Sequence, residues 1–319
     1  MSRVLVPGGA SYIGAYLVPH LLGDGHYVTV YDTFSFGDPG LPKSNDHLNI
    51  VKADVRDKTA WKSVCTGKDA IIYLASVSRE AMCQKYETLA HQINVEALGP
   101  DIEIAKGEGV SQFIYASSVA VYGSSNKPAN EKHPINPTSI YGKHKAESED
   151  IVWKAMDADF SCLVTRSASV CGYSPRMRFD LTINRMIHDA YRTKTITVEG
   201  GEQIRSHIHM RDICGFYRRL LETDLTGEAF NVVCENQKVR ESAELVQSII
   251  DCDIVFKDRV DDRSYSINGD KAIRMLDFTP QYKLEQAIYE TKARMDNGLW
   301  KDSQTNPKYQ NMIEPTLVS

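Results

Sequence analysis

The chain of 319 residues is long enough to bury a large core, either as one α/β unit or as two closely fused domains. Its hydrophobic fraction of 42% and its charged fraction of 25% are those of a soluble globular protein, which excludes the disordered and fibrous classes. Its formal net charge of -5 offers no basic surface to a phosphate backbone, so we expect no nucleic-acid partner.

The cysteines and the first residues indicate a cytoplasmic location. The seven cysteines form no Cys-x-x-Cys pair and lie mostly in apolar surroundings, which is typical of buried, reduced thiols. The chain runs directly into the strand-like stretch Arg3-Val4-Leu5-Val6 without a leader, and no stretch approaches membrane-spanning length. We therefore expect a cytoplasmic protein without a membrane partner.

Short apolar runs alternate with helical patterns through the first half of the chain. The predicted strands cover residues 4–6, 27–31, 50–53, 70–74 and 112–116. The predicted helices cover about 12–22, 59–64, 94–106 and 140–156. Strands separated by helices imply right-handed crossovers and a parallel sheet covered on both faces, so the predicted fold class is a doubly wound α/β fold.

Beyond residue 165 the alternation loosens, which indicates a second, smaller lobe. The pattern predicts a strand at 162–165, a helix ending near 191, a strand at 229–233 that rejoins the first sheet, and helices at 242–250 and 284–293. We expect one domain at 1–168 with about 205–234, and a discontinuous C-terminal lobe at 169–204 and 235–300. The polar tail 301–319 is expected to wrap the surface or to fray.

The first predicted strand ends in a glycine-rich turn, Pro7-Gly8-Gly9-Ala10-Ser11-Tyr12-Ile13-Gly14, and a helix follows at once, as a dinucleotide-binding fingerprint requires. Gly8 permits the tight turn, Gly14 lets the helix pack on the strand, and the helix N-terminus offers N–H groups to a pyrophosphate. Ser11 replaces the middle glycine, from which we expect an altered affinity for NAD. A plain glycine turn between a strand and a helix is the alternative interpretation.

Two acidic residues follow the next strands. Asp32 ends the second predicted strand, where a carboxylate accepts hydrogen bonds from both ribose hydroxyls and repels a 2′-phosphate, so NAD is favoured over NADP. Asp54 follows the third strand and is expected either to bind the adenine amino group or to cap a helix.

Tyr141 and Lys145 stand four residues apart on one predicted helix and therefore share a face. An ammonium beside a phenol favours the phenolate, which lowers the tyrosine pKa toward the range of a general base. The pair follows a strand that ends in Ser117-Ser118, at the edge of the sheet where a cofactor binds, and Ser118 is suited to polarise the reacting hydroxyl.

At these residues the sequence resembles the extended short-chain dehydrogenase/reductase family, and within it the NAD-dependent nucleotide-sugar epimerases and dehydratases. The resemblance covers about residues 2–300. It rests on the glycine-rich turn and on Leu74-Ala75, Asn94-Val95, Ser117 to Gly123, Tyr141 to Lys145, Arg205 to Asp212 and Phe230 to Val232. It implies a Rossmann-like fold, a nucleotide-sugar-binding C-terminal lobe, NAD as cofactor, and a homodimer formed through the helices that carry Asn94 and Tyr141.

The resemblance also implies roles for individual residues. The implied catalytic residues are Ser118, Tyr141 and Lys145. The implied cofactor-binding residues are Gly8, Ser11, Tyr12, Ile13, Gly14, Asp32, Asp54, Val55, Leu74, Ala75, Asn94, Ser117, Tyr141 and Lys145. The implied substrate-binding residues are Ser118, Asn184, Arg205 and Arg263, and no metal site is expected.

The two residues after Ser118 reduce the number of reactions that we expect. The family's 4,6-dehydratases carry an Asp-Glu pair there and its decarboxylases a glutamate, whereas Val119-Ala120 of this chain cannot move a proton. We therefore expect oxidation at C4 by a nucleotide-sugar 4-epimerase. The alternatives are a 4-dehydrogenase that releases the 4-keto sugar, to which the segment 174–181 is similar, and a non-catalytic NAD-binding sensor or scaffold. A metal enzyme built on His207-x-His209 is a weaker alternative, since no third ligand lies nearby.

Overall fold

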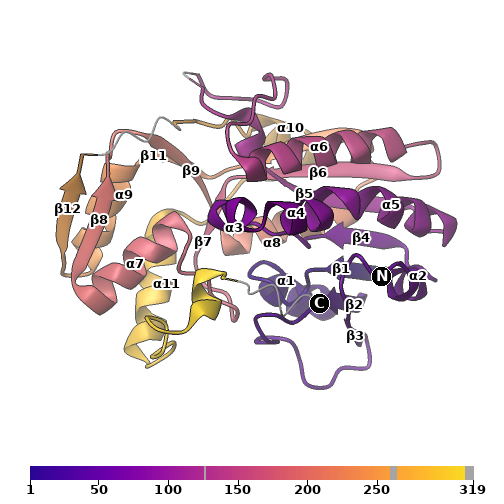
Figure 1. The fold of residues 1–319 in the computed structure, drawn as a ribbon, viewed down its shortest axis with the longest axis horizontal. Coiled ribbons are helices and arrows are strands. Elements are labelled where there is room, and N and C mark those ends of the chain that lie inside the picture. Colours follow the sequence, from indigo (N-terminus) through magenta and orange to yellow (C-terminus); the bar gives the residue numbers. More distant parts are fainter. Residues whose placement is uncertain (126, 259–263, 313–319) are drawn as a thin grey trace.

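A seven-stranded parallel sheet forms the centre of the computed structural model, which describes residues 1–125, 127–258 and 264–312 (Figure 1). The strand order is β10-β6-β5-β4-β1-β2-β3, and every pair is parallel. The strands are β1 (Arg3–Pro7), β2 (Tyr27–Asp32), β3 (Leu48–Lys52), β4 (Ala70–Tyr73), β5 (Gln112–Ser118), β6 (Ser161–Ser167) and β10 (Glu228–Val232). This sheet confirms the predicted doubly wound fold and the return of the strand near 229–233.

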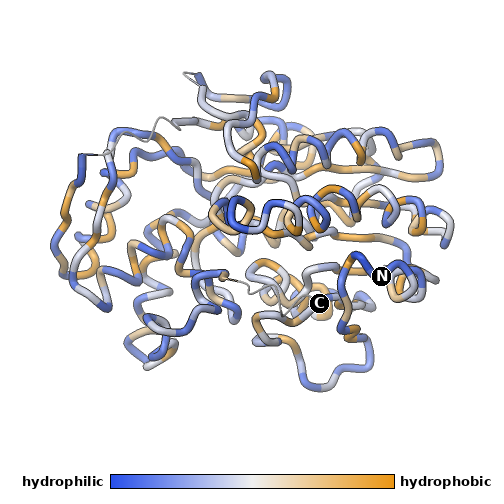
Figure 2. Tube along the Cα trace, in the orientation of Figure 1, coloured by the Kyte–Doolittle hydropathy of each residue, from blue (hydrophilic) through white to orange (hydrophobic). Residues whose placement is uncertain are grey.

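Alternating residues of each strand face two helical layers, because successive side chains of a strand point to opposite faces. Val4 and Val6 pack with α1 (Gly14–Gly23), α8 (Met210–Leu221) and α10 (Asp270–Leu276), whereas Leu5 packs with the opposite layer. That layer consists of α2 (Lys58–Cys65), α5 (Leu98–Gly107) and α6 (Ile140–Ala155). Figure 2 shows the hydrophobic strands between the more polar helices. No helix among the described residues is long and apolar enough to cross a membrane.

A smaller lobe with its own core lies beside the carboxyl edge of the large sheet (Figure 1). Its strands are β7 (Ser169–Cys171), β8 (Thr195–Glu199), β9 (Ile204–His209), β11 (Glu235–Lys238) and β12 (Asp253–Lys257), in the sheets β11-β9-β7 and β12-β8. Its helices are α7 (Thr182–Thr193), α9 (Val239–Ile249) and α11 (Leu284–Asp296). Residues 205–234 are shared between the two parts of the molecule, because β9 pairs in the smaller lobe whereas α8 packs on the large sheet. The domain boundaries that we expect from the sequence stay a prediction.

The helix predicted at 94–106 differs in the structure. It starts as a π-helix, η1 (Gln92–Glu96), and continues as α5, and two short helices that the pattern did not predict precede it. These are α3 (Glu80–Lys85) and α4 (Glu87–His91), and a 3-10 turn, η2 (Val119–Tyr122), follows β5. Elements of four to six residues are too short for the periodicity of apolar residues to identify them.

The C-terminal segment packs along the smaller lobe. Its last described helix is the 3-10 turn η3 (Pro307–Gln310), shown in yellow in Figure 1. The backbone N–H of Phe179 donates to the carbonyl of Tyr309 at 2.7 Å, and the Phe179 ring contacts Trp300. The segment therefore packs on the surface of the folded protein as far as residue 312, and most of its side chains stay exposed.

A buried ion pair ties α6 to the large sheet. Arg166 on β6 and Glu149 on α6 are 5% and 0% exposed, and Arg166 Nη2 lies 2.6 Å from Glu149 Oε2. Ser117 Oγ donates to Glu149, and Arg166 Nη1 donates to the Tyr122 hydroxyl at 2.8 Å. Because every partner is satisfied, the pair fixes the position of α6 instead of leaving a buried charge unpaired.

Breaking this pair from one side should destabilise the protein strongly. Arg166→Met leaves Glu149 buried without its cation, which we expect to lower the free energy of unfolding by about 3 to 5 kcal/mol. The double variant Glu149→Gln with Arg166→Met removes both charges and should recover part of that loss in urea unfolding. A single variant within about 1 kcal/mol of the wild type would contradict this role.

Candidate active site

The glycine-rich turn has the close backbone approach that its sequence predicts. Gly8 adopts φ +80°, and a Cβ at that position would lie 2.8 Å from the backbone nitrogen of Ala75. A Cβ at Gly14 would lie 2.5 Å from the carbonyl oxygen of Gly8. Glycine at position 8 therefore lets the turn pack against the end of β4, and glycine at position 14 lets the start of α1 pack against the turn. This arrangement brings the N-terminus of α1 to the turn, where its N–H groups suit an anion.

Ser11 occupies the turn without disturbing it. Its backbone N–H donates to the Gly8 carbonyl at 3.0 Å, and its Oγ accepts a hydrogen bond from the Gly14 N–H at 3.3 Å. This N–H belongs to the first turn of α1, where a bound phosphate would also seek donors. The Gly14 N–H is thus engaged by Ser11, but the Ser11 hydroxyl still has its own proton to donate. A side-chain donor therefore takes the place of a backbone donor.

Asp32 is held by backbone donors at the mouth of a cavity beside the turn. Its two carboxylate oxygens accept from the N–H groups of Ala10 at 3.0 Å and Phe34 at 2.8 Å, and burial raises its pKa. The cavity is also lined by Asp54, Val55, Leu74, Ala75, Tyr86, Leu89 and Ile93. A carboxylate at one end and apolar walls at the other suit a ribose followed by a flat base.

Asp54 and Asn94 support this cavity through contacts within the protein. The Asp54 carboxylate is bound by the guanidinium of Arg56 at 2.9 and 3.0 Å, and Asp57 instead caps α2. The Asn94 amide accepts from the Val77 N–H at 2.7 Å and donates to the Val77 carbonyl at 3.1 Å. Asn94 thus fixes the loop after β4, and it does not line the cavity.

The three predicted catalytic residues meet at one cleft of about 550 Å³ at the carboxyl edge of the sheet. Ser118 comes from the end of β5, and Tyr141 and Lys145 come from the first turns of α6. Lys145 Nζ donates to the Ala116 carbonyl at 2.7 Å and lies 5.7 Å from the centre of the Tyr141 ring. The predicted juxtaposition of a phenol, an amine and a hydroxyl is therefore present.

The start of α6 is fixed by two polar side chains. Ser139 caps the helix by accepting from the Gly142 N–H at 3.0 Å. Glu80, on α3, accepts from the backbone N–H groups of Ile140 at 3.1 Å and Tyr141 at 2.9 Å. A carboxylate on the positive end of the helix is favourable, and it holds the tyrosine that faces the cleft.

The electrostatics of the pair differ from the sequence-based expectation. Burial lowers the pKa of Lys145 to about 7, although Glu149 opposes the shift. Burial raises the pKa of Tyr141, and Arg178 is the charge that counters this shift most, followed by a hydrogen bond from Ser118. A buried lysine loses its proton before a buried phenol does, so the ammonium supports the phenolate less than the spacing alone suggests.

The predicted substrate-binding residues do not all lie at the cleft. Arg205 lines the cleft, whereas Asn184 is fully buried outside it. The Asn184 amide donates to the Tyr12 hydroxyl at 2.9 Å and accepts from the Gly172 N–H at 3.1 Å. Asn184 therefore links the glycine-rich turn to the smaller lobe. Arg263 lies outside the described residues.

Charged residues that the predicted site does not include also line the cleft, and one short segment supplies Arg176, Arg178 and Asp180. Arg178 and Asp180 form an ion pair of 2.7 Å, and Arg178 Nη1 donates to the Ser78 hydroxyl at 2.8 Å. In the sequence these residues stand two apart, a spacing that puts side chains on the same side of an extended segment. The segment is irregular, however, so the spacing could not show that these side chains line the cleft.

The histidines of β9 do not form a metal centre in the described part of the chain. His207 and His209 are both buried, and no group of three His, Cys, Asp or Glu side chains there is arranged to hold an ion. Burial lowers the pKa of His207 to about 3, so this ring is neutral. His209 Nε2 lies 3.1 Å from Glu290 Oε1.

The buried amine of Lys145 should make stability depend on pH. Its pKa is about 7 in the folded protein and about 10.4 when unfolded, so between these values the unfolded state binds more protons and stability rises with pH. Relative to Lys145→Met, the wild type should gain about 2 kcal/mol of unfolding free energy between pH 7 and pH 9. Lys143→Met, on the exposed side of α6, is the control. A difference that stays constant with pH would show that the amine is not desolvated.

Comparisons with known proteins identify the family of the chain. The model of the NAD dependent epimerase/dehydratase family matches residues 4–233. UDP-glucose 4-epimerase 4 of Oryza sativa subsp. japonica is 27% identical over an alignment 262 residues long, which covers 72% of this chain and 71% of that protein. UDP-arabinose 4-epimerase 1 of Arabidopsis thaliana is 29% identical over 190 residues, 56% of this chain, and the match spans less than half (45%) of that protein.

The fold is shared with a solved dehydratase as well. The dTDP-glucose 4,6-dehydratase DesIV of Streptomyces venezuelae, solved with NAD bound, aligns with a TM-score of 0.85 at 23% identity, and the alignment covers 94% of this chain and 99% of that one. The family model extends over most of the chain and includes the glycine-rich turn, Ser118, Tyr141 and Lys145. The chain therefore belongs to the NAD dependent epimerase/dehydratase family, which confirms the predicted cofactor, NAD.

Proposed function

We propose that this protein oxidises C4 of a nucleoside-diphosphate sugar and returns the hydride to the opposite face, as a nucleotide-sugar 4-epimerase. The observation that carries the proposal is the meeting of Ser118, Tyr141 and Lys145 at one cleft that also contains Ser11 and Ile13 of the glycine-rich turn. Bound NAD supplies the hydride acceptor and donor in this chemistry. An intact proton-transfer set beside a dinucleotide cradle disfavours a purely structural, NAD-sensing role.

The residues of the cleft divide the proton chemistry between them. Tyr141 takes the proton of the 4-hydroxyl as a general base, and Ser118 stabilises the oxygen as it becomes a carbonyl. Because burial raises the pKa of Tyr141, the phenolate needs positive charge nearby. Lys145 supplies it when protonated, and Arg178 adds a permanent charge that its ion pair with Asp180 moderates.

The surroundings of Ser118 favour epimerisation over dehydration. Val119 and Ala120 line the cleft directly after Ser118 and carry no acidic group. Of the acidic residues in the lining, Glu80 caps α6 and Asp180 is paired with Arg178, whereas Asp189 and Glu199 lie on α7 and β8 of the smaller lobe. Elimination needs an additional acid and base at the sugar, and the two residues after Ser118 supply neither. Release of the 4-ketone, as in a 4-dehydrogenase, remains the alternative fate of the oxidised sugar.

The substrate that we propose carries a nucleoside diphosphate, because the cleft continues from the catalytic residues into the smaller lobe. Arg205 and Arg185 contribute positive charge to that part of the lining. A guanidinium suits a diphosphate because its planar fork donates two parallel hydrogen bonds.

The seven cysteines are all free, which supports our proposal of a cytoplasmic, reducing location.

Replacing the proposed base tests the proposal directly. Tyr141→Phe removes only the hydroxyl, and we expect kcat to fall by about 100-fold or more while the Kd for NAD stays unchanged. The assay is product analysis by NMR on UDP-, GDP-, CDP- and dTDP-sugars. Tyr289→Phe, an exposed tyrosine on α11, is the matched control and should keep full activity. Undiminished turnover by Tyr141→Phe would refute the assignment.

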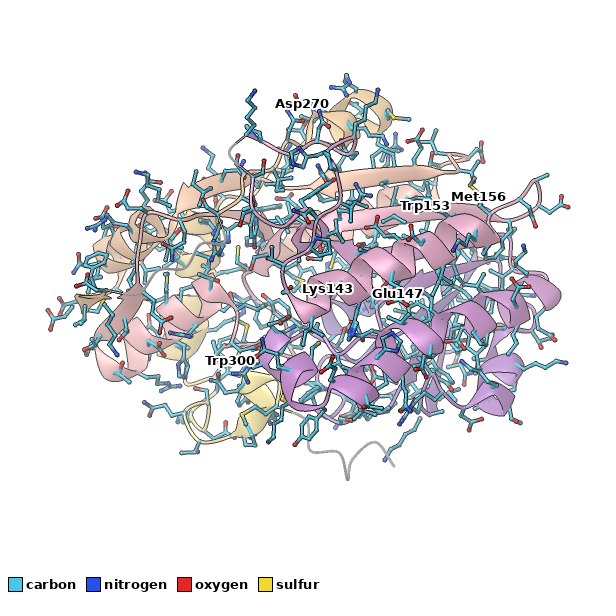
Figure 3. All side chains as sticks on the ribbon, turned by 45° about the horizontal axis from the view of Figure 1, so that its top comes forward. Lys143, Glu147, Trp153, Met156, Asp270 and Trp300 are labelled. Atoms are coloured by element: carbon cyan, nitrogen blue, oxygen red, sulfur yellow. The ribbon has the colours of Figure 1, made fainter. Side chains whose placement is uncertain are left out.

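We also propose that two copies associate through α5 and α6, which pack side by side on one face of the sheet. Figure 3 shows Lys143, Glu147 and Trp153 along α6, at the surface of the molecule. Paired helices from each copy would form a four-helix contact. Sedimentation should therefore give about twice the chain mass of 35.8 kDa, and Trp153→Glu should halve it. A monomeric wild type at micromolar concentration would exclude the dimer.

A further inference from the structure

The guanidinium of Arg176 is buried at the cleft without an acidic partner. The residue is 4% exposed, and its Nη2 donates to Asn311 Oδ1 at 2.6 Å. Among residues 1–125, 127–258 and 264–312, none accepts a hydrogen bond from its Nε or Nη1, and none forms an ion pair with it. A buried cation with two unsatisfied donors is costly, so a structure retains one where an anion completes it.

The place of Arg176 points to the cofactor part of the cleft. Its guanidinium lies 4.0 Å from the centre of the Phe36 ring, and both residues line the same cleft as Ser11 and Ile13 of the glycine-rich turn. Phe36 also lines the neighbouring cavity that contains Asp32. Arg176 therefore lies where the expected ribose site meets the N-terminus of α1.

The charges around Arg176 do not neutralise it. Asp32 interacts with it over a longer distance but accepts its hydrogen bonds from backbone N–H groups, and Asp180 is paired with Arg178. Burial lowers the pKa of Arg176 to about 9, and the neighbouring Arg178 adds to this effect. Because a guanidinium keeps its proton in proteins, a ligand anion is the group that would offset this cost.

We propose that Arg176 binds the diphosphate of the dinucleotide, together with the N–H groups at the N-terminus of α1. A diphosphate carries two negative charges, and its several oxygens can accept hydrogen bonds from both unsatisfied donors of Arg176, Nε and Nη1, which lie on different sides of the guanidinium. The inference rests on the proposed function for the identity of the dinucleotide. It adds a residue from the smaller lobe to a site that the glycine-rich turn forms in the large one.

The C-terminal segment is part of this arrangement. Asn311, which holds Arg176, is 7% exposed and adopts a left-handed conformation with φ 50°. The preceding residue, Gln310, accepts at its carbonyl a hydrogen bond of 2.6 Å from Arg79, in the loop after β4. The segment thus joins the loop after β4 to Arg176, and it orients the guanidinium for the ligand.

Calorimetric titration with adenosine, ADP and NAD tests the proposal. Arg176→Met keeps the length of the side chain and removes the charge, so the Kd for ADP and NAD should rise by about 10-fold or more while that for adenosine stays within about 2-fold. Asn311→Gly keeps the left-handed backbone and frees the guanidinium, and it should weaken the same two ligands to a smaller extent. Arg218→Met, a surface arginine paired with Asp24, is the matched control and should leave all three unchanged.

The remaining outcomes separate the possible failures. Unchanged binding of ADP and NAD by folded Arg176→Met would overturn the proposal, as would a loss that is equal for adenosine. Should only the affinity for UDP in the presence of saturating NAD fall, the guanidinium binds the diphosphate of the substrate instead, and the cofactor assignment is wrong. Failure of the wild type to bind ADP and NAD would overturn the proposed function itself. If Arg176→Met does not fold, the comparison of Asn311→Gly with the wild type decides.

Discussion

The position of helix α6 against the carboxyl edge of the sheet is the constraint on which the site depends. Glu149 and Arg166 tie the middle of the helix to β6, and Glu80 holds its first turn through two backbone N–H groups. The helix cannot rotate without breaking buried, charge-assisted hydrogen bonds. Tyr141 and Lys145 therefore face the cleft because the helix is fixed at the Tyr141 backbone and again at Glu149, about one turn beyond Lys145.

Three basic side chains buried in one cleft, Lys145, Arg176 and Arg178, give the site its electrostatic character. Burial lowers the pKa of Lys145, and within the part of the chain that the structure describes only the Asn311 amide accepts a hydrogen bond from the guanidinium of Arg176. The net charge of the chain is negative, so the positive character is local and does not follow from composition. A cleft of this kind favours ligands that carry phosphate on one side of a neutral sugar. The same positive electrostatic potential would then act on the reacting hydroxyl and on the phosphates of the cofactor.

The sequence predicts those parts of the molecule that depend on regular spacing. Alternating strands and helices gave the doubly wound sheet, and the four-residue spacing of Tyr141 and Lys145 placed both on one face. Asn184 shows the limit, because its residue type suited a phosphate contact while its place in the fold engages it with Tyr12. Arg176 and Asn311 are 135 residues apart, and only tertiary packing brings them together. The pKa of Lys145 likewise depends on burial, which spacing does not report.

The central claim is that one hydride leaves C4 of a nucleotide-sugar and returns to the same carbon. Nucleoside-diphosphate sugars that carry deuterium at C4, incubated with the purified protein and NAD, test it by NMR of the product. The account predicts the 4-epimer with deuterium retained at C4. A product that has lost the deuterium, or a panel of sugars left unchanged without reduction of the nicotinamide, would contradict it.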